Sequence, residues 1–187
     1  MLVALRMVLL MTLLTGILYP LVMTRAANAL FPRKASGSVL TKGGIVIGSE
    51  LIAQNFRSDR YFWPRPSAID YSPLPSGGSN YGPTSRALKN MAEKRRILFL
   101  HANDLSDSIR VPADMVFSSA SGLDPDISPQ AALLQVERIG RTRAFDDERR
   151  GKLIALVQEY IVGRQFGLLG QPRVNVLLLN RALDAMH

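Results

Sequence analysis

The residues of this chain best suited to bind an anion lie in one glycine-rich loop. The loop consists of Ser76, Gly77, Gly78, Ser79 and Asn80. The backbone amides of such a loop can approach a phosphate closely, and the positive end of a helix expected from Pro83 would add to the attraction. Against this, Pro83 lacks an amide hydrogen, and the loop contains no lysine or arginine. Three interpretations stay open: a phosphate cradle, a contact for a protein partner, and a purely structural turn.

Two carboxylates form the second group of residues that could do chemistry. Asp124 and Asp126 lie two positions apart in a turn that also contains Gly122, Leu123 and Pro125. A carboxylate pair at this spacing can bind a cation, or can act as acid and base in an exported hydrolase. An Asp-Pro turn that leads into a helix cap has the same sequence pattern and needs no chemistry. Both interpretations place a turn here, but only the first makes it an active centre.

The rest of the chain supplies no catalytic set. There is no cysteine, which excludes disulfides, thiol catalysis and cysteine-based zinc sites. The two histidines, His101 and His187, have no ligand or base spacing around them. No G-x-S-x-G elbow is present, and no Walker lysine follows the glycines. The sequence therefore predicts a chain that is not an enzyme, with no catalytic residue, no metal and no cofactor of its own.

The elements that must position these loops predict an α+β domain. Extended segments are expected on both sides of a hairpin turn at 42–44. Residues 61–67 contain two prolines, so they are expected to form an edge strand or an extended loop. A strand is expected around VPADMVF within 108–118. Helices are expected from Pro83, from Pro129 after an N-cap at Ser128, and from the acidic run 146–148. Residues 172–186 predict a short strand followed by a terminal helical turn.

The N-terminus predicts a membrane helix. Residues 7–24 carry no charge, and as a helix they would measure about 27 Å, close to the hydrocarbon thickness of a bilayer. An A-x-A pattern at 27–29 is also compatible with a cleaved signal peptide, but the apolar run is longer than a usual signal core. The expected division is a tail at 1–6, a transmembrane helix at 7–24, a linker at 25–38 and a soluble α+β domain at 39–187.

The net charge of +8 and the pI of about 10.3 leave several classes of partner open. The basic residues are scattered along expected helices, and the longest run is only 94–96. Aromatic residues are few and are not interleaved with the basic ones, as a nucleic-acid-binding platform requires. The composition therefore argues against nucleic acid as a partner. Charge counting around the apolar run does not decide which side of a membrane the domain occupies.

Five stretches in order, preceded by the apolar run, resemble one family. They are GSELIAQNF, YFWPRPSAIDY, SGGSNYGPTS, VPADMVFSSASGLDPDISPQAA and LGQPRVNVLLLN. Together they resemble the C subunit of the Kdp complex, the high-affinity potassium-transporting P-type ATPase of bacteria and archaea, over nearly the whole chain. Two positions depart from the family pattern: Pro64 replaces a small residue, and Asp126 replaces a histidine. The second departure puts in doubt any role assigned to a histidine at that turn.

The resemblance implies a fold, partners and a location. It implies a single span in the cell inner membrane, a cytoplasmic N-terminus, and a single compact extracytoplasmic, periplasmic domain. The implied partners are membrane lipid, a channel-like potassium-binding subunit and a P-type ATPase subunit, whose ATP affinity this subunit raises as a catalytic chaperone. In this family the segment Ser76–Ser79 has been likened to the glycine-rich signature of ABC ATPases.

The resemblance and elementary physics point to different roles for the glycine loop. A loop outside the membrane cannot contact cytoplasmic ATP, so any effect on ATP affinity must pass through the complex. We therefore expect the loop and the turn Gly122–Pro125 to be docking elements of a non-catalytic accessory subunit that reaches ATP only through its complex. The alternative is a nucleotide-binding module that contacts ATP directly through Ser76–Asn80.

Overall fold

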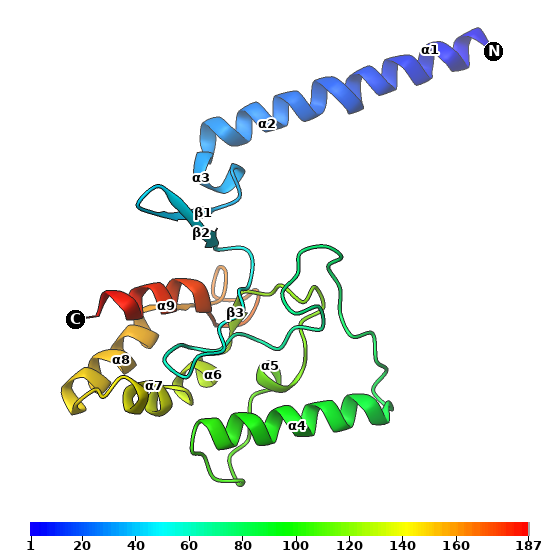
Figure 1. The fold of residues 1–187 in the computed structure, drawn as a ribbon. Helices are drawn as coiled ribbons and strands as arrows, with labels where there is room; N and C mark the ends of the chain where they lie inside the picture. Colours follow the sequence, from blue (N-terminus) through cyan, green and yellow to red (C-terminus); the bar gives the residue numbers. More distant parts are fainter. Residues whose placement is uncertain (187) are drawn as a thin grey trace. The chain divides into compact units, whose positions relative to one another are not determined.

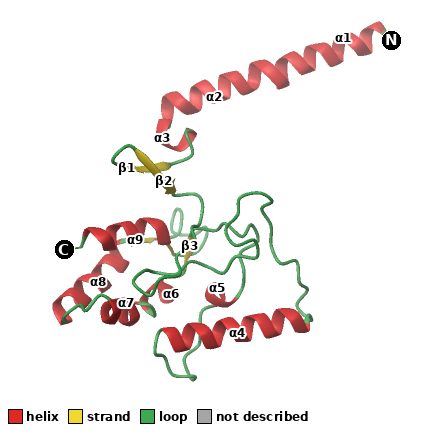
Figure 2. Ribbon diagram, viewed as in Figure 1, coloured by secondary structure: helices red, strands yellow, loops and turns green. Residues whose placement is uncertain are grey.

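The computed structural model describes residues 1–186, so the predicted isolated histidine at the last position lies outside the described residues. The chain divides into two compact units, 1–49 and 50–187 (Figure 1). Helices and short strands are mixed in both, as Figure 2 shows, which confirms the α+β prediction. The unit boundary places the 39–49 segment with the N-terminal helix, whereas the sequence suggested that the soluble domain begins at residue 39.

One long apolar helix forms most of the first unit. It runs through α1 (Leu2–Met11), a π-helical segment η1 (Thr12–Leu18) and α2 (Tyr19–Leu30), and it is long and apolar enough to cross a membrane. The wide turn lies where Pro20, in the first turn of α2, has no amide hydrogen to donate and would crowd the carbonyl four residues back. The Thr15 hydroxyl donates to the Met11 carbonyl oxygen at 2.7 Å within this turn. The predicted span at 7–24 falls inside this helix.

A short helix and a hairpin complete the first unit. They are α3 (Pro32–Ala35) and the antiparallel strands β1 (Val39–Lys42) and β2 (Ile45–Ser49). Gly43 and Gly44 form the turn with φ angles of 57° and 81°. Positive φ at both central residues is the geometry that matches the twist of a two-residue hairpin, which explains the two glycines. The predicted hairpin is confirmed.

The second unit packs helices around a small antiparallel sheet with strand order β3-β5-β4. Its elements are α4 (Arg86–Ala102), α5 (Ala113–Val116), β3 (Asp126–Ile127), α6 (Pro129–Leu133), α7 (Val136–Thr142), α8 (Asp147–Glu159), β4 (Ile161–Val162), β5 (Arg173–Asn175) and α9 (Val176–Ala185). Side chains from loops, sheet and helices meet in one core, among them Phe62, Ile139, Leu153, Val174 and Leu179. The loop around residue 62 is thus anchored in the core by the fully buried Phe62.

Three helices of the second unit begin at or near the predicted positions, and Ser128 is the cap that the sequence predicts. The Ser128 hydroxyl accepts the Ala131 amide ahead of α6, and Asp146 accepts the Arg149 amide at the start of α8. The helix expected from Pro83 begins three residues later, because the Ser85 hydroxyl caps α4 by accepting the Leu88 amide. Helix starts are local signals, which is why the sequence predicts them to within a few residues.

Three predictions of secondary structure are wrong in type or extent. VPADMVF forms the helical turn α5, in which the neighbouring Met115 and Val116 are both buried; a short apolar run alone does not distinguish helix from strand. The helix after Pro129 is broken between α6 and α7, and the terminal helical turn is the ten-residue α9. Residues 61–67 are a loop without strand pairing, one of the two forms expected.

Candidate docking site

The structure brings the two predicted loops together. The Gly77 amide donates to the Ser121 carbonyl oxygen at 3.1 Å, so residues of the glycine loop pair directly with the turn that precedes Asp124. We call this contact the glycine junction and define it as Ser76–Asn80 together with Ala120–Pro125. Nothing in the sequence predicts the contact, because each loop is visible only by its own glycines and prolines.

Glycine is required at two positions of the junction. A Cβ at Gly122 would lie 2.5 Å from Ile69 Cγ1 and 3.0 Å from the Gly77 carbonyl oxygen, and Gly122 has a φ of +71°. A Cβ at Gly78 would lie 3.0 Å from the Ala120 carbonyl oxygen. Gly77 has open space around its Cβ direction, with nothing within 4 Å. The two loops therefore touch through their backbones, while the Cβ direction of Gly77 points into open space.

The geometry of the junction differs from that of a phosphate cradle. The Gly77 amide is already bonded to a carbonyl, and Gly78 packs against another carbonyl oxygen, whose partial negative charge repels an anion. Helix α4 starts at Arg86, beyond the loop, and the Ser85 side chain already occupies one of its first amides. The inner face of the loop is thus committed to the turn, and its outer face is what remains for a ligand or a partner.

Asp124 and Asp126 are each paired with an arginine. Asp124 Oδ2 lies 2.6 Å from Arg65 Nη1, and Asp126 Oδ2 lies 2.9 Å from Arg173 Nε. The other oxygen of Asp124 accepts the Asp126 amide at 3.0 Å, the geometry of an aspartate-initiated turn. Burial raises the pKa of Asp126 above its ordinary value, and Arg173 opposes this shift. The arrangement fits the structural interpretation of the pair, because both carboxylates are used within the fold.

Residues 1–186 contain no group of three or more histidine, cysteine, aspartate or glutamate side chains placed to hold a metal ion. His101 is exposed in the last turn of α4, within that described part of the chain. The side chains singled out for chemistry therefore form no such metal-binding group in the described residues.

Backbone hydrogen bonds tie the turn of the junction to the core. The Ala53 amide donates to the Leu123 carbonyl oxygen at 2.9 Å, and the Val176 amide at the start of α9 donates to the Pro125 carbonyl oxygen at 3.0 Å. Because β3 begins directly after Pro125 and pairs with β5, the turn is fixed on three sides. The glycine loop, attached to this turn, inherits a rigid support.

A hollow of about 530 Å³ in the second unit is lined partly by Trp63, Tyr71 and Arg95. Tyr71 precedes the loop with a φ of 60°, and its hydroxyl donates to the Arg65 carbonyl oxygen at 2.7 Å. Burial raises the pKa of the Tyr71 phenol to about 12. Tyr71 thereby fastens the start of the loop to the segment that carries the Asp124 partner.

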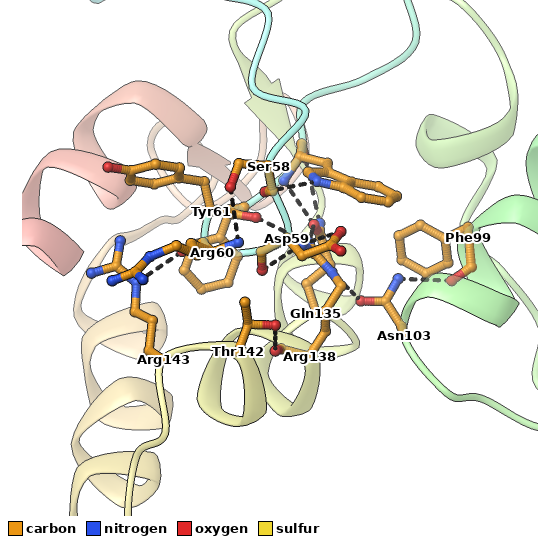
Figure 3. Close-up of polar contacts among 12 residues, drawn as sticks. Ser58, Asp59, Arg60, Tyr61, Phe99, Asn103, Gln135, Arg138, Thr142 and Arg143 are labelled. Carbon is orange, nitrogen blue, oxygen red and sulfur yellow. Dashed lines mark hydrogen bonds and ion pairs between the residues drawn. The ribbon is translucent and has the colours of Figure 1, made fainter.

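Sequence reasoning missed a buried arginine network (Figure 3). The Arg138 guanidinium on α7 donates to the carbonyl oxygens of Asp59 at 2.8 Å and Tyr61 at 3.0 Å. It also donates to Gln135 Oε1 at 2.7 Å and Asn103 Oδ1 at 3.0 Å. We call Arg138 and these four acceptors the arginine network. It joins three segments that lie far apart in the chain.

Arg138 is only 1 % exposed, so its charge needs these partners. Its guanidinium also lies 4.2 Å from the centre of the Trp63 ring, a cation–π contact. Burial lowers the pKa of Arg138 to about 10. The one available sequence signal is an arginine between Val136 and Ile139 on an apolar helix side, and it says nothing about the acceptors. The network holds 59–63, the segment that leads to Arg65 and on to the junction.

Comparison with known proteins gives a consistent result. A family model described as the c chain of K+-transporting ATPase, KdpC, matches residues 1–185. A potassium-transporting ATPase KdpC subunit from Methylococcus capsulatus is 50 % identical over 187 residues, covering 98 % of this chain and 96 % of the relative. The corresponding subunit from Variovorax paradoxus is 50 % identical over 179 residues, covering 94 % of this chain and 91 % of that relative.

Proposed function

The chain belongs to the KdpC family of K+-transporting ATPase subunits, and from this premise we propose that it is a non-catalytic docking subunit of the potassium pump. In this role it is needed for assembly with a channel-like potassium-binding subunit and a P-type ATPase subunit, and it raises the ATP affinity of the latter. Its span lies in the cell inner membrane with the N-terminus in the cytoplasm and the 50–187 unit in the periplasm.

The observation that carries the proposal is the glycine junction. Its inner face is used by backbone contacts between the two loops, and its outer face presents a glycine-rich segment whose residues 76–80 contain no lysine or arginine. A preorganised backbone surface loses little conformational entropy when a partner binds, which suits docking better than catalysis. An effect on ATP affinity is then a coupling free energy transmitted through the partner subunits.

Copurification of the complex tests the docking surface. Gly77→Val places two methyl groups on the outer face, where nothing lies within 4 Å, so the fold is kept while the surface changes. We expect the affinity for the other subunits to fall about tenfold, which corresponds to about 1.4 kcal/mol. The matched control is Gly151→Val, a glycine on α8 that also has open space around it and should assemble normally.

The alternative, direct nucleotide binding through Ser76–Asn80, makes the opposite prediction. Under that alternative, Gly77→Val leaves the complex assembled, and the purified subunit's own saturable binding of a labelled ATP analogue is lost. Under the docking proposal the isolated subunit shows no saturable binding to begin with. Intact assembly combined with lost ATP binding would overturn the docking proposal.

The side of the membrane is tested by labelling single cysteines, which the cysteine-free chain permits. Ser79→Cys is treated with an impermeant thiol reagent in cells whose outer envelope has been made permeable, with Leu2→Cys as the control expected to stay inside. We expect Ser79→Cys to react in intact cells and Leu2→Cys to react only after lysis. Reaction of Ser79→Cys only after lysis would place the loop on the ATP side and favour the nucleotide-binding alternative.

A further inference from the structure

The connection between β4 and β5 ends in a group of exposed apolar side chains. Phe166 is 92 % exposed, Leu168 79 % and Leu169 60 %. We call residues Phe166–Leu169 the apolar tip. Single exposed apolar residues are common on protein surfaces, but three large ones within four positions on one turn are not explained by chance.

The apolar tip is held by its own backbone. Gln165 and Leu169 exchange two hydrogen bonds, with the Gln165 amide 2.8 Å from the Leu169 carbonyl oxygen and the Leu169 amide 2.9 Å from that of Gln165. The Leu168 amide also donates to the Gln165 carbonyl oxygen at 3.1 Å, and the Gly167 amide to that of Arg164 at 3.2 Å. These bonds reduce the number of unpaired amides that burial of the tip would take out of water.

Phe166 is held in a backbone conformation that suits it poorly. Its φ of 53° lies in the left-handed region, which is unusual for a bulky side chain and costs on the order of 1–3 kcal/mol. Strain of this kind persists where the surrounding structure enforces it, often at functional sites. The Phe166 ring does not offset this strain by packing in the core, because it is exposed to water. The buried side chain near this connection is Val174 of β5.

We propose that the apolar tip inserts into an apolar pocket on another protein chain of the same ATPase, with an acidic group on the pocket rim facing Arg164. The inference rests on the proposed docking function and adds a second contact surface to it. Arg164 is exposed and forms no ion pair within residues 1–186, and the segment 161–172 contains no carboxylate, so an acidic rim complements it.

A protein pocket fits the tip better than a lipid surface does. Lipid tails impose no shape, so an apolar loop gains nothing there from a strained, fixed backbone. A protein pocket rewards one aromatic anchor held in place and flanked by leucines, because preorganisation lowers the entropy lost on binding. The membership of the chain in a family of ATPase c chains means that such partner chains exist.

The first test separates folding from docking by the substitution Phe166→Asn. Asparagine tolerates the left-handed region, so the variant relieves the strain while it removes the anchor. We expect the stability of the isolated full chain to stay equal or rise, while affinity for the partner subunits falls at least about tenfold. Unchanged affinity would overturn the inference. Loss of stability together with affinity would show that the ring serves the fold, which would also overturn it.

The second test identifies what covers the tip. A spin label is attached at Leu168→Cys, with Ile154→Cys on α8 as the reference, and its accessibility to water-soluble nickel reagent and to apolar oxygen is measured in lipid nanodiscs. We expect the tip label to meet nickel when the chain is alone and to be shielded from both reagents in the assembled complex. A label that oxygen reaches but nickel does not, in the chain alone, would mean membrane contact and overturn the inference.

The same measurement distinguishes failure of this inference from failure of the proposed function. If the complex forms while the tip label stays open to nickel, the tip does not dock, and the glycine junction remains the candidate surface. If the wild-type chain does not copurify with any other subunit, the proposed docking function itself fails.

Discussion

The glycine junction and the arginine network both fasten loops of the second unit, but by opposite means. The network uses one large side chain whose guanidinium reaches acceptors on three segments. The junction depends on the absence of side chains at Gly78 and Gly122. A Cβ at either position would lie 3.0 Å from a carbonyl oxygen of the opposite loop. The network is buried and serves the core, whereas the junction leaves an outer face available. The difference shows that two kinds of contact hold the loops of this unit: a buried side-chain network, and a backbone contact with one exposed face.

The comparison also predicts how each region fails. In the network, removing atoms is harmful, because buried acceptors lose their donors. At Gly78 and Gly122 of the junction, adding atoms is harmful, because carbonyl oxygens and Ile69 occupy the space. Substitutions of opposite kinds therefore probe the two regions, and matched controls at exposed sites separate each effect from the general cost of mutation.

The largest expected effect is in the network. Arg138→Met keeps an unbranched apolar stem but leaves four acceptors and the Trp63 face without the guanidinium. We expect a loss of about 3–5 kcal/mol in the free energy of unfolding. Trp63 is the single tryptophan of the chain, so its fluorescence during urea unfolding in detergent reports this site directly.

The matched control for the network is Arg141→Met on the same helix. Arg141 is paired with Asp104 at 3.2 Å, and both side chains are more than half exposed. Its loss should cost at most about 1 kcal/mol. Equal effects of the two substitutions would mean that the buried acceptors find other donors, and the network would not be the source of rigidity proposed for it.

The next largest effect is in the junction. Gly122→Ala combines left-handed backbone strain with contacts of 2.5 Å to Ile69 Cγ1 and 3.0 Å to the Gly77 carbonyl oxygen. We expect a loss of about 2–3 kcal/mol in the free energy of unfolding, measured by the same urea titration. Gly170→Ala is the control, because Gly170 has a similar φ of +79° but nothing within 4 Å of its Cβ direction.

The control should cost about 1 kcal/mol from the backbone alone. The difference between the two substitutions measures how tightly the loop Ser76–Asn80 packs on the turn. If Gly122→Ala costs no more than Gly170→Ala, Ile69 and the glycine loop move aside easily. The junction would then be loose, and the argument for a preorganised docking surface would lose its physical basis.

The two regions show which parts of the structure can be predicted from the sequence. The hairpin turn at Gly43 and Gly44, the cap at Ser128 and the helix start at the acidic run 146–148 are encoded within a few residues, and all are confirmed. The sequence predicts a strand where α5 forms. This prediction is wrong because the burial of α5 is set by partners elsewhere in the chain. Residue type and local spacing do not report tertiary contacts.

The same limit applies to the site. Both loops of the junction are conspicuous by their glycines and prolines, yet the Gly77–Ser121 hydrogen bond joins segments with no shared sequence signal. The arginine network is harder still to predict, since Arg138, Asn103 and Asp59 are ordinary polar residues in isolation. The family resemblance predicted membership of the ATPase complex, which no single residue pattern does, and it is confirmed over residues 1–185.

The smallest expected effect concerns the pH dependence at the entrance to the glycine loop. Burial raises the pKa of Tyr71 to about 12, from an ordinary value of 10.0. As the pH rises, the Tyr71 phenol therefore loses its proton in the unfolded state before it does so in the folded state. The resulting stabilisation is fully present below about pH 10 and is lost as the pH rises through about 12. Tyr71→Phe lacks this titration.

We therefore compare the unfolding free energies of the wild type and Tyr71→Phe at several pH values between about 8 and 11.5. At the lower pH the wild type should be more stable by about 1 kcal/mol, because its hydroxyl donates to the Arg65 carbonyl oxygen at 2.7 Å. The gap should narrow as the pH rises above about 10, since only the wild-type unfolded state gains from ionisation there. A gap that is constant with pH would mean that the phenol is solvated. The start of the loop would then be free to move, unlike the segments that the buried Arg138 side chain holds.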